Sequence, residues 1–177
     1  MTPPSVGTWK ASFQLGGPGG FLGQPFDAGA GAAEMGLPDG RGRARDFQNG
    51  SIYWTPQTGA FEIHGLIRVH WAQLGGVRSI LRYPVTDELG TPDGRGRFNH
   101  FEGGSIYWTP QTGAHEIHGA IRDKWASMGW ERSFLGYPVS DELGVPGSNQ
   151  RISRFEHGEI RWTPDGGAQA IRSQALD

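Results

Sequence analysis

The stretch Gly-Ser-Ile-Tyr-Trp-Thr-Pro-Gln-Thr-Gly-Ala runs from Gly50 to Ala60 and returns unchanged from Gly104 to Ala114. An altered third copy, Gly-Glu-Ile-Arg-Trp-Thr-Pro-Asp-Gly-Gly-Ala, runs from Gly158 to Ala168. A Phe stands three residues before each copy, at Phe47, Phe101 and Phe155, so the period is 54 residues (101 − 47 and 155 − 101). A fixed period of roughly this length, about 20–50 residues, is the signature of repeat architectures.

The period divides the whole chain. Residues 47–100 and 101–154 are full repeats, residues 1–46 resemble the second half of a repeat, and residues 155–177 are the first half of another. Because a terminal half-repeat cannot bury its apolar face alone, we expect the two halves to complete one unit. The sequence thus predicts a single repeat domain, 1–177, closed into a pseudo-threefold, propeller-like ring. The alternative is a segment cut from a longer array.

Each repeat predicts a β-hairpin followed by a short helix. Ser51–Trp54 and Ala60–His64 are rich in strand-forming residues, and Thr-Pro-Gln-Thr-Gly between them has turn chemistry. Ile67, Trp71 and Leu74 then follow at helical spacing. A long ordered loop, Leu81–Asn99, completes the repeat. The fold class expected is therefore mainly β with short helices.

Comparison of the copies predicts which positions are buried. Three positions keep the same apolar residue in every copy and are expected in the core: Ile52, Ile106 and Ile160; Trp54, Trp108 and Trp162; Ile63, Ile117 and Ile171. Three others change character in the third copy and are expected to face solvent: Tyr53 and Tyr107 become Arg161, Glu62 and Glu116 become Ala170, and His64 and His118 become Arg172.

Composition excludes several classes of function. The net charge of −2 provides no basic surface for nucleic acid, and no apolar run approaches the ~20 residues of a membrane span. The chain contains no Cys, and its first residues carry no signal-peptide pattern. With 7 Trp, 9 Phe and 4 Tyr it nevertheless has enough apolar area for a folded core.

Acidic pairs recur at Asp87-Glu88 and Asp141-Glu142. Adjacent carboxylates can bind sugar hydroxyls or a cation, or act as general acid and base. They can also accept backbone N–H groups and fix the loop, and we favour this structural role. Catalytic carboxylates occur once per active site in differing environments, whereas these pairs are copied.

Alternation along a strand places Glu62 and His64 on one face, and Glu116 and His118 repeat this arrangement. The spacing matches no standard metal-ligand pattern, so we expect a solvated face or polar ligand contacts, and no metal or cofactor. Tyr53 and Tyr107 are candidates for stacking on sugar rings. The predicted ligand-binding residues are Tyr53, Glu62, His64, Asp87, Glu88, Tyr107, Glu116, His118, Asp141 and Glu142.

Two further features have a structural interpretation. The tyrosines Tyr83 and Tyr137 precede Pro, and we expect them to pack between repeats. The loops Gly40–Arg43 and Gly94–Arg97 each read Gly-Arg-Gly-Arg, and their Arg residues are expected to form salt bridges rather than nucleic-acid contacts.

These motifs together resemble the LGFP repeat. The motif that gives this family its name corresponds to Leu22-Gly-Gln-Pro25, Leu81-Arg-Tyr-Pro84 and Leu135-Gly-Tyr-Pro138. Arg82 replaces the motif Gly, and none of the three has Phe at the third position. The resemblance implies a non-catalytic module that is attached to actinobacterial envelope enzymes, such as mycoloyltransferases and amidases, and holds these enzymes on the wall polysaccharide. Repeats of this type also occur in fungal proteins.

Together with the sequence, this resemblance implies an extracellular or cell-envelope module, lectin-like and multivalent, that binds a cell-wall polysaccharide or other glycan and is fused to or associated with an envelope enzyme. A protein-interaction or structural domain is the first alternative. A glycan-acting hydrolase that uses an Asp-Glu pair is the second.

Overall fold

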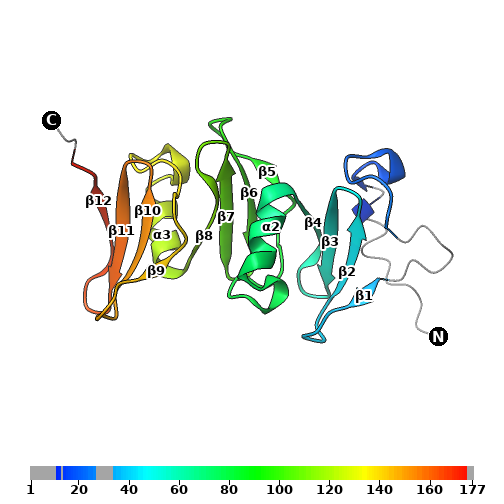
Figure 1. Cartoon of the computed structure of the whole chain (residues 1–177), viewed down its shortest axis with the longest axis horizontal. Helices are drawn as coiled ribbons and strands as arrows, with labels where there is room; N and C mark the ends of the chain where they lie inside the picture. Colours follow the sequence, from blue (N-terminus) through cyan, green and yellow to red (C-terminus); the bar gives the residue numbers. More distant parts are fainter. Residues whose placement is uncertain (1–10, 13, 27–33, 175–177) are drawn as a thin grey trace. The chain divides into compact units, whose positions relative to one another are not determined.

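The computed structural model describes residues 11, 12, 14–26 and 34–174. It is mainly β, with three four-stranded antiparallel sheets in the orders β1-β2-β3-β4, β5-β6-β7-β8 and β12-β11-β10-β9 (Figure 1). The strands are β1 (Met35–Gly36), β2 (Arg43–Phe47), β3 (Gly50–Thr55), β4 (Gly59–His64), β5 (Leu89–Gly90), β6 (Arg97–Phe101), β7 (Gly104–Thr109), β8 (Gly113–His118), β9 (Leu143–Gly144), β10 (Arg151–Phe155), β11 (Gly158–Thr163) and β12 (Gly167–Arg172). The helices are α2 (Gly65–Leu74) and α3 (Gly119–Ser127), with 3-10 turns η1 (Gly17–Gly19), η2 (Gly76–Arg78) and η3 (Trp130–Arg132).

The chain forms two compact units. One holds the chain up to Glu88 together with Asn99–Glu102, and the other holds Leu89–Phe98 together with the chain from Gly103 onward.

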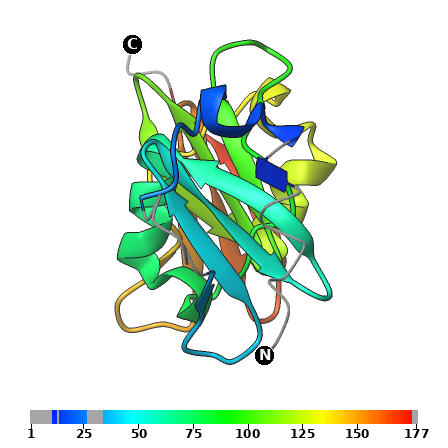
Figure 2. The same ribbon diagram turned by 90° about the vertical axis from the view of Figure 1, so that its right-hand side faces the viewer.

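The predicted hairpin is confirmed in every copy. In the first sheet, β3 and β4 pair from Gly50↔His64 to Thr55↔Gly59, and Figure 2 shows β2 and β3 side by side. The turn is fixed by Thr55, whose Oγ1 accepts the N–H of Thr58 at 2.9 Å, and by Gly59 in the left-handed region at φ 82°.

The loop predicted for Leu81–Asn99 is partly wrong, because it contains β5 and the start of β6. Each sheet joins the hairpin of one repeat to the two strands that precede it. The residues before the hairpin alternate weakly in polarity, so the sequence alone did not mark them as strands. The repeat boundaries 1–46, 47–100, 101–154 and 155–177 remain a prediction from the period.

The core predictions hold for five of the nine residues. Ile52, Ile106 and Ile160 are fully buried, as are Ile63 and Ile117. The third member of the second set, Ile171, is 46% exposed. In the first two copies a helix starts directly after the strand and covers this position, and no helix follows β12 among the described residues. The Trp at positions 54, 108 and 162 is half-buried rather than central.

The helices bury the predicted stripe. Ile67 and Trp71 of α2 are 2% exposed, and Ile121 and Trp125 of α3 are at most 1% exposed. The helix α2 ends at Gly75, whose φ of 113° lets its N–H turn back to the carbonyl groups of the last turn. In the second unit, α3 packs on β7 and β8 and also on β11 and β12.

The motif segments begin with a fully or nearly buried Leu at Leu22, Leu81 and Leu135. Gly23 and Gly136 adopt φ values of 74° and 72°, and Arg82 at the equivalent place adopts 58°. A non-Gly residue is strained in this region, so Arg82 keeps the backbone of the motif at an energetic cost. In the sequence, Trp9 stands at the place of Trp71, and a Gly/Ala-rich insertion, Ala28–Ala33, separates Pro25 from Glu34. Both features lie outside the described residues.

A clasp, defined here as an Asp and an Arg of one loop with a Tyr and a Glu further along the chain, occurs twice. In the first, Tyr83 donates to Asp39 Oδ1 at 2.7 Å, and Arg41 donates two hydrogen bonds to Glu102 at 2.8 and 3.1 Å. The predicted salt bridges of these Arg loops are therefore confirmed for Arg41.

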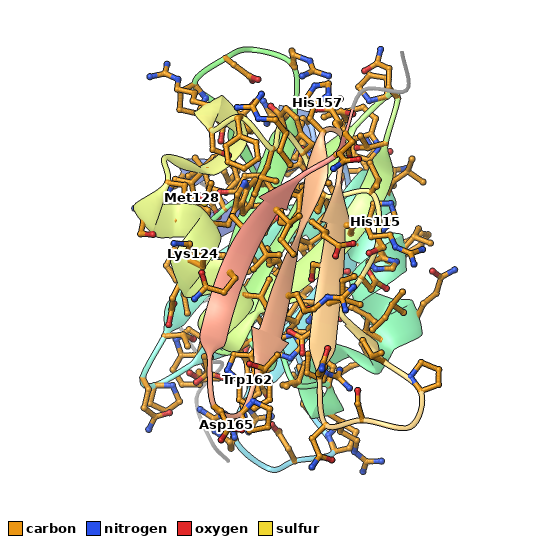
Figure 3. The ribbon with its side chains drawn as sticks, turned by 90° about the vertical axis from the view of Figure 1, so that its left-hand side faces the viewer. His115, Lys124, Met128, His157, Trp162 and Asp165 are labelled. Carbon is orange, nitrogen blue, oxygen red and sulfur yellow. The ribbon has the colours of Figure 1, made fainter. Side chains whose placement is uncertain are left out.

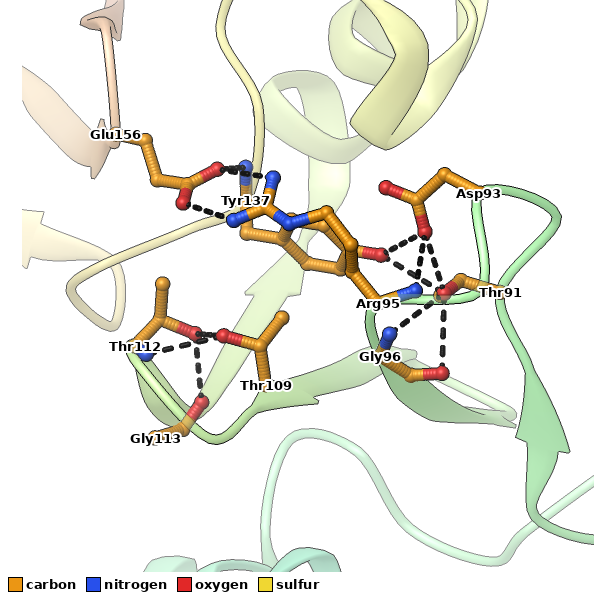
Figure 4. A network of polar contacts seen from close by, with 9 residues as sticks. All are labelled: Thr91, Asp93, Arg95, Gly96, Thr109, Thr112, Gly113, Tyr137 and Glu156. Atoms are coloured by element: carbon orange, nitrogen blue, oxygen red, sulfur yellow. Dashed lines mark hydrogen bonds and ion pairs between the residues drawn. The ribbon is translucent and has the colours of Figure 1, made fainter.

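The second clasp has the same design (Figure 4). Tyr137 donates to Asp93 at 2.5 Å and also lies 2.8 Å from Thr91 Oγ1, while Arg95 binds Glu156 at 2.6 and 3.3 Å. Burial raises the pKa of the Tyr137 hydroxyl, as does its hydrogen bond to Asp93. Both tyrosines are fully buried, as expected.

Each of the three sheets has two edges, so none is closed on itself. The closed ring therefore stays a prediction from the sequence period.

Candidate functional site

The predicted acidic and histidine residues meet at the end of a strand. Glu62 and His64 share a face of β4, and the chain returns beside them at Asp87 and Glu88 after α2 and the motif segment. We call Glu62, His64 and Glu88 the first Glu-His-Glu cluster. Glu116, His118 and Glu142 form the second, at the end of β8.

In the first cluster a histidine lies between two carboxylates. His64 Nδ1 is 2.8 Å from Glu62 Oε2, and His64 Nε2 is 3.3 Å from Glu88 Oε1. The other oxygen of Glu62 accepts the backbone N–H of Glu88 at 2.8 Å. Glu62 therefore holds both the imidazole and the loop that carries the second carboxylate.

The second cluster repeats this geometry. His118 Nδ1 is 2.7 Å from Glu116 Oε2, and Nε2 is 3.3 Å from Glu142 Oε2. Glu116 Oε1 accepts the N–H of Glu142 at 2.9 Å. The hydrogen bond from Glu116 raises the pKa of His118 above its ordinary value, against the opposing effect of burial.

Asp87 and Asp141 have the structural role that we favoured. Each accepts the backbone N–H of the strand glutamate, Glu62 or Glu116, at 2.9 Å. Burial raises the pKa of Asp87, and the nearby charge of Glu62 adds to this effect, while the backbone hydrogen bond opposes it. Glu88 and Glu142 differ from the aspartates because each contacts the histidine of its cluster, whereas Asp141 lies 3.6 Å from a different histidine, His115.

The expectation that Glu62 and Glu116 face solvent is wrong, since they are 2% and 4% exposed. A carboxylate can be buried when it is paired and hydrogen-bonded, and the partners of the Glu62 carboxylate are the His64 ring and the backbone N–H of Glu88, 26 residues further along the chain. The histidines are the accessible part, with side chains 26% exposed for His64 and 15% for His118.

The structure does not bring Tyr53 and Tyr107 to these clusters. Ile52 is paired with Glu62, so the adjacent Tyr53 points to the opposite face of the sheet, and Tyr107 is placed in the same way in its own sheet. Tyr53 packs edge-on against Trp71 at 4.7 Å. Tyr107 is 3% exposed, so the prediction that it faces solvent is wrong.

Two site residues were missed from the sequence. Arg151 Nε donates to Glu142 Oε1 at 2.7 Å, and the Phe21 ring, 48% exposed, lies 5.0 Å from the His64 ring. A signal for Arg151 was available, because Arg43, Arg97 and Arg151 recur at the 54-residue period even though the preceding loop changes in the third copy. Phe21 gave no comparable signal.

The third copy has no cluster, because Ala170 and Arg172 replace the glutamate and histidine. Arg172 instead lies over the Phe134 ring at 4.4 Å, the same place at which His64 meets Phe21. A cation can stack on an aromatic face with a gain of about 0.5–1 kcal/mol at exposed sites. This copy therefore keeps the packing of the strand end without the carboxylates.

Both ring nitrogens of each cluster histidine already face carboxylates. Within the described residues, no group of three or more His, Asp or Glu side chains is arranged to hold a metal ion. In the same part of the chain, no helix has the length and apolar character to cross a membrane.

Comparison with known proteins gives one family. The LGFP repeat matches three segments, residues 31–79, 81–133 and 135–177, which together cover most of the chain. No curated protein matches the chain. With its 54-residue period and its three motif segments, this chain belongs to the LGFP repeat family.

Proposed function

We propose that this chain is a non-catalytic module that binds cell-wall polysaccharide at the cell envelope, through the two Glu-His-Glu clusters as equivalent sites. The observation that carries the proposal is the duplication itself, since both clusters place a partly exposed histidine between two carboxylates at matching distances. Two weak sites gain avidity on a repetitive polymer without any new contact.

The chemistry of the clusters suits a polyhydroxylated ligand. Carboxylate and imidazole groups are acceptors and donors for sugar hydroxyls. Leu89 and Leu143 follow the outer glutamates and are 45% and 43% exposed, so each cluster has an apolar neighbour for the C–H faces of a sugar. In this proposal His64, Glu88, His118 and Glu142 contact the glycan, and Glu62, Glu116, Asp87 and Asp141 position them.

The alternative of a hydrolase receives less support. General acid and base pairs work because their environments separate the two pKa values. Here Glu62 and Glu116 have the same partners in the two clusters, a histidine ring and the backbone N–H of the outer glutamate. A hydrolase also predicts one indispensable carboxylate, whereas two binding sites predict that each cluster contributes a share.

The test is sedimentation of the chain with insoluble actinobacterial wall polysaccharide, with chitin and cellulose as comparison polymers. His64→Gln with Glu88→Gln removes the first cluster, and His118→Gln with Glu142→Gln removes the second. We expect loss of either cluster to weaken binding about 10²-fold or more through lost avidity, and loss of both to abolish it.

Asp165→Asn, in an exposed turn and in neither cluster, is the matched control and should sediment like the wild type. Circular dichroism of every variant checks that the fold is intact. Absence of sedimentation with any polymer, or full retention after both clusters are removed, would contradict the proposal.

Ring closure has its own test. A compact chain of 177 residues has a radius of gyration of about 16 Å, and a closed ring should lie near that value in small-angle X-ray scattering. A clearly larger radius would rule out closure.

A further inference from the structure

The ring of Tyr53 is packed less completely than the ring of Tyr107, its counterpart in the second repeat. Tyr107 is 3% exposed, and two rings stack on it, Phe98 at 5.0 Å and 10° and Trp130 at 5.9 Å and 23° between the ring planes. Tyr53 is half-buried, and among the described residues its ring contacts one other ring, that of Trp71, edge-on. The Tyr53 ring is therefore without the stacked neighbours that cover Tyr107.

Two small residues stand where the second repeat has the stacking rings. Ala44 pairs with Tyr53 across β2 and β3, and it precedes Phe98 by one period of 54 residues (98 − 44). Gly76 precedes Trp130 by the same period (130 − 76). Gly76 and Trp130 each begin the 3-10 turn after the helix, with φ of 59° and 57°. The first repeat thus lacks the two side chains that fill the space beside the tyrosine in the second.

Hydrogen-bonding groups border the Tyr53 ring. Its hydroxyl forms no hydrogen bond among the described residues. Asp46 and Arg68 form an ion pair at 3.4 Å, with side chains 36% and 38% exposed. Both lie close enough to influence the Tyr53 hydroxyl, because burial and the charge of Asp46 raise its pKa while Arg68 opposes this effect. A ligand on the Tyr53 ring would therefore have a hydroxyl, a carboxylate and a guanidinium group beside it.

This combination favours a sugar over a purely apolar occupant. A pyranose has C–H faces that can lie on an aromatic ring, and hydroxyl groups around its edge that need polar partners. A purely apolar occupant would take the Tyr53 hydroxyl and the Asp46–Arg68 pair out of water without replacing their hydrogen bonds, which is costly. The third sheet, whose strands β10, β11 and β12 face the viewer in Figure 3, has Arg161 at the tyrosine position and offers no ring there.

We propose that Tyr53, Ala44 and Gly76 form a stacking platform for one pyranose residue of a glycan. The Tyr53 hydroxyl and the Asp46–Arg68 pair are the partners of the sugar hydroxyls. The platform lies on the face of the first sheet opposite to the first Glu-His-Glu cluster, so it is a separate site. That the sugar belongs to wall polysaccharide rests on the proposed function, whereas the platform itself does not depend on the clusters.

The probes are the methyl glycosides of glucopyranose, galactopyranose and mannopyranose, titrated into the isotope-labelled full chain and followed by NMR. Ligands of this size bind in about the millimolar range, so the titration extends well above it. We expect saturable shifts of the Tyr53 ring and Ala44 methyl signals with at least one of the three glycosides.

Gly76→Trp should close the platform with the ring that the second repeat carries, and should weaken binding about tenfold or more. The site accepts this change, because Trp130 adopts the same backbone conformation and a Cβ at Gly76 would lie 3.7 Å from the Trp71 ring. Gly76→Ala is the matched control, since it changes the backbone position in the same way without adding a ring, and it should bind like the wild type. Tyr53→Leu keeps an apolar side chain without a flat ring, and it should weaken binding as much as Gly76→Trp, as followed at the Ala44 methyl group.

Absence of saturable shifts at Tyr53 with all three glycosides, or shifts that survive Gly76→Trp, would overturn the proposal. Larger shifts with indole than with any glycoside would assign the platform to an aromatic side chain and overturn it too. His64→Gln with Glu88→Gln should leave the Tyr53 shifts unchanged, and their loss in this variant would also count against a separate site. Failure of the chain to sediment with wall polysaccharide while Tyr53 still responds to a glycoside would contradict the proposed function alone.

Discussion

Replacing Tyr137 with Phe removes one hydroxyl from the second clasp and leaves the ring. The ring is fully buried and stays in place, so no large cavity forms. The lost hydrogen bond goes to a charged acceptor, Asp93, and such bonds contribute about 1.5–3 kcal/mol. Asp93 keeps hydrogen bonds from the Thr91 hydroxyl at 2.8 Å and the Arg95 N–H at 3.0 Å, which favours the lower end, about 1.5 kcal/mol.

The assay is urea and thermal unfolding of the full chain. For a chain of this length, 1.5 kcal/mol corresponds to a decrease of about 3–6 °C in Tm. Tyr83→Phe removes the equivalent bond to Asp39 and should give a similar loss. Tyr53→Phe is the matched control, because its hydroxyl forms no hydrogen bond among the described residues, and it should change stability by less than about 0.5 kcal/mol.

The effect should also depend on pH. Burial opposes ionisation of Asp93, but the hydrogen bonds from Tyr137, Arg95 and Thr91 together lower its pKa. A carboxyl group whose pKa is lowered by folding stabilises the protein above its unfolded pKa, about 4, and this contribution is lost as the pH falls through the folded pKa. The difference in unfolding free energy between the wild type and Tyr137→Phe should therefore decrease as the pH is lowered from 7 to 3. An equal gap at both pH values, or none at pH 7, would refute this reasoning.

Three other predictions follow from the same structure. Arg82→Gly should raise stability by about 0.5–1 kcal/mol by relieving the left-handed conformation at φ 58°, and a lower urea midpoint would contradict this. Ile171→Ala should lower the unfolding free energy by less than about 0.5 kcal/mol, while Ile117→Ala at the equivalent buried position should lower it by about 2–5 kcal/mol. Equal losses in urea unfolding would contradict the difference in burial between the two positions. Folding raises the pKa of His118, so protonation of this residue stabilises the fold below the unfolded pKa of about 6.5, and the contribution is lost as the pH rises through the folded pKa. The Tm of the wild type should therefore exceed that of His118→Gln by more at pH 5.5 than at pH 8.5.

The sequence predicted the features that depend on local pattern and on the comparison of copies. The hairpin around Thr55 and Gly59 needs only strand-forming residues and a turn, and both are present in every copy. The helix from Gly65 follows from the spacing of Ile67 and Trp71. Likewise, invariance at Ile52 identified the position that every sheet buries.

The missed features depend on contacts distant in the sequence. Variation at Glu62 suggested solvent exposure, yet its partners lie in a loop on the far side of a helix. Ala170 of the third copy has no carboxylate, so the change from glutamate there removes a buried hydrogen-bonded group and not a solvated one. Variation between copies thus reflected the loss of a buried polar network, and not exposure. Ile171 was an incorrect core prediction because no helix covers it among the described residues.

The division of each clasp among successive repeats has a consequence for the gene. Asp39 and Arg41 precede the first identical eleven-residue stretch, and Tyr137 and Glu156 follow the second. A recombination between these two stretches would delete one 54-residue period and place Asp39 at the clasp spacing from Tyr137, and Arg41 at that spacing from Glu156. The reverse event would add a period with both halves of a new clasp. The number of repeats can therefore change in one genetic step without leaving a buried tyrosine hydroxyl unpaired. A recombination that did not add or remove whole 54-residue periods would not restore the spacing between the clasp partners.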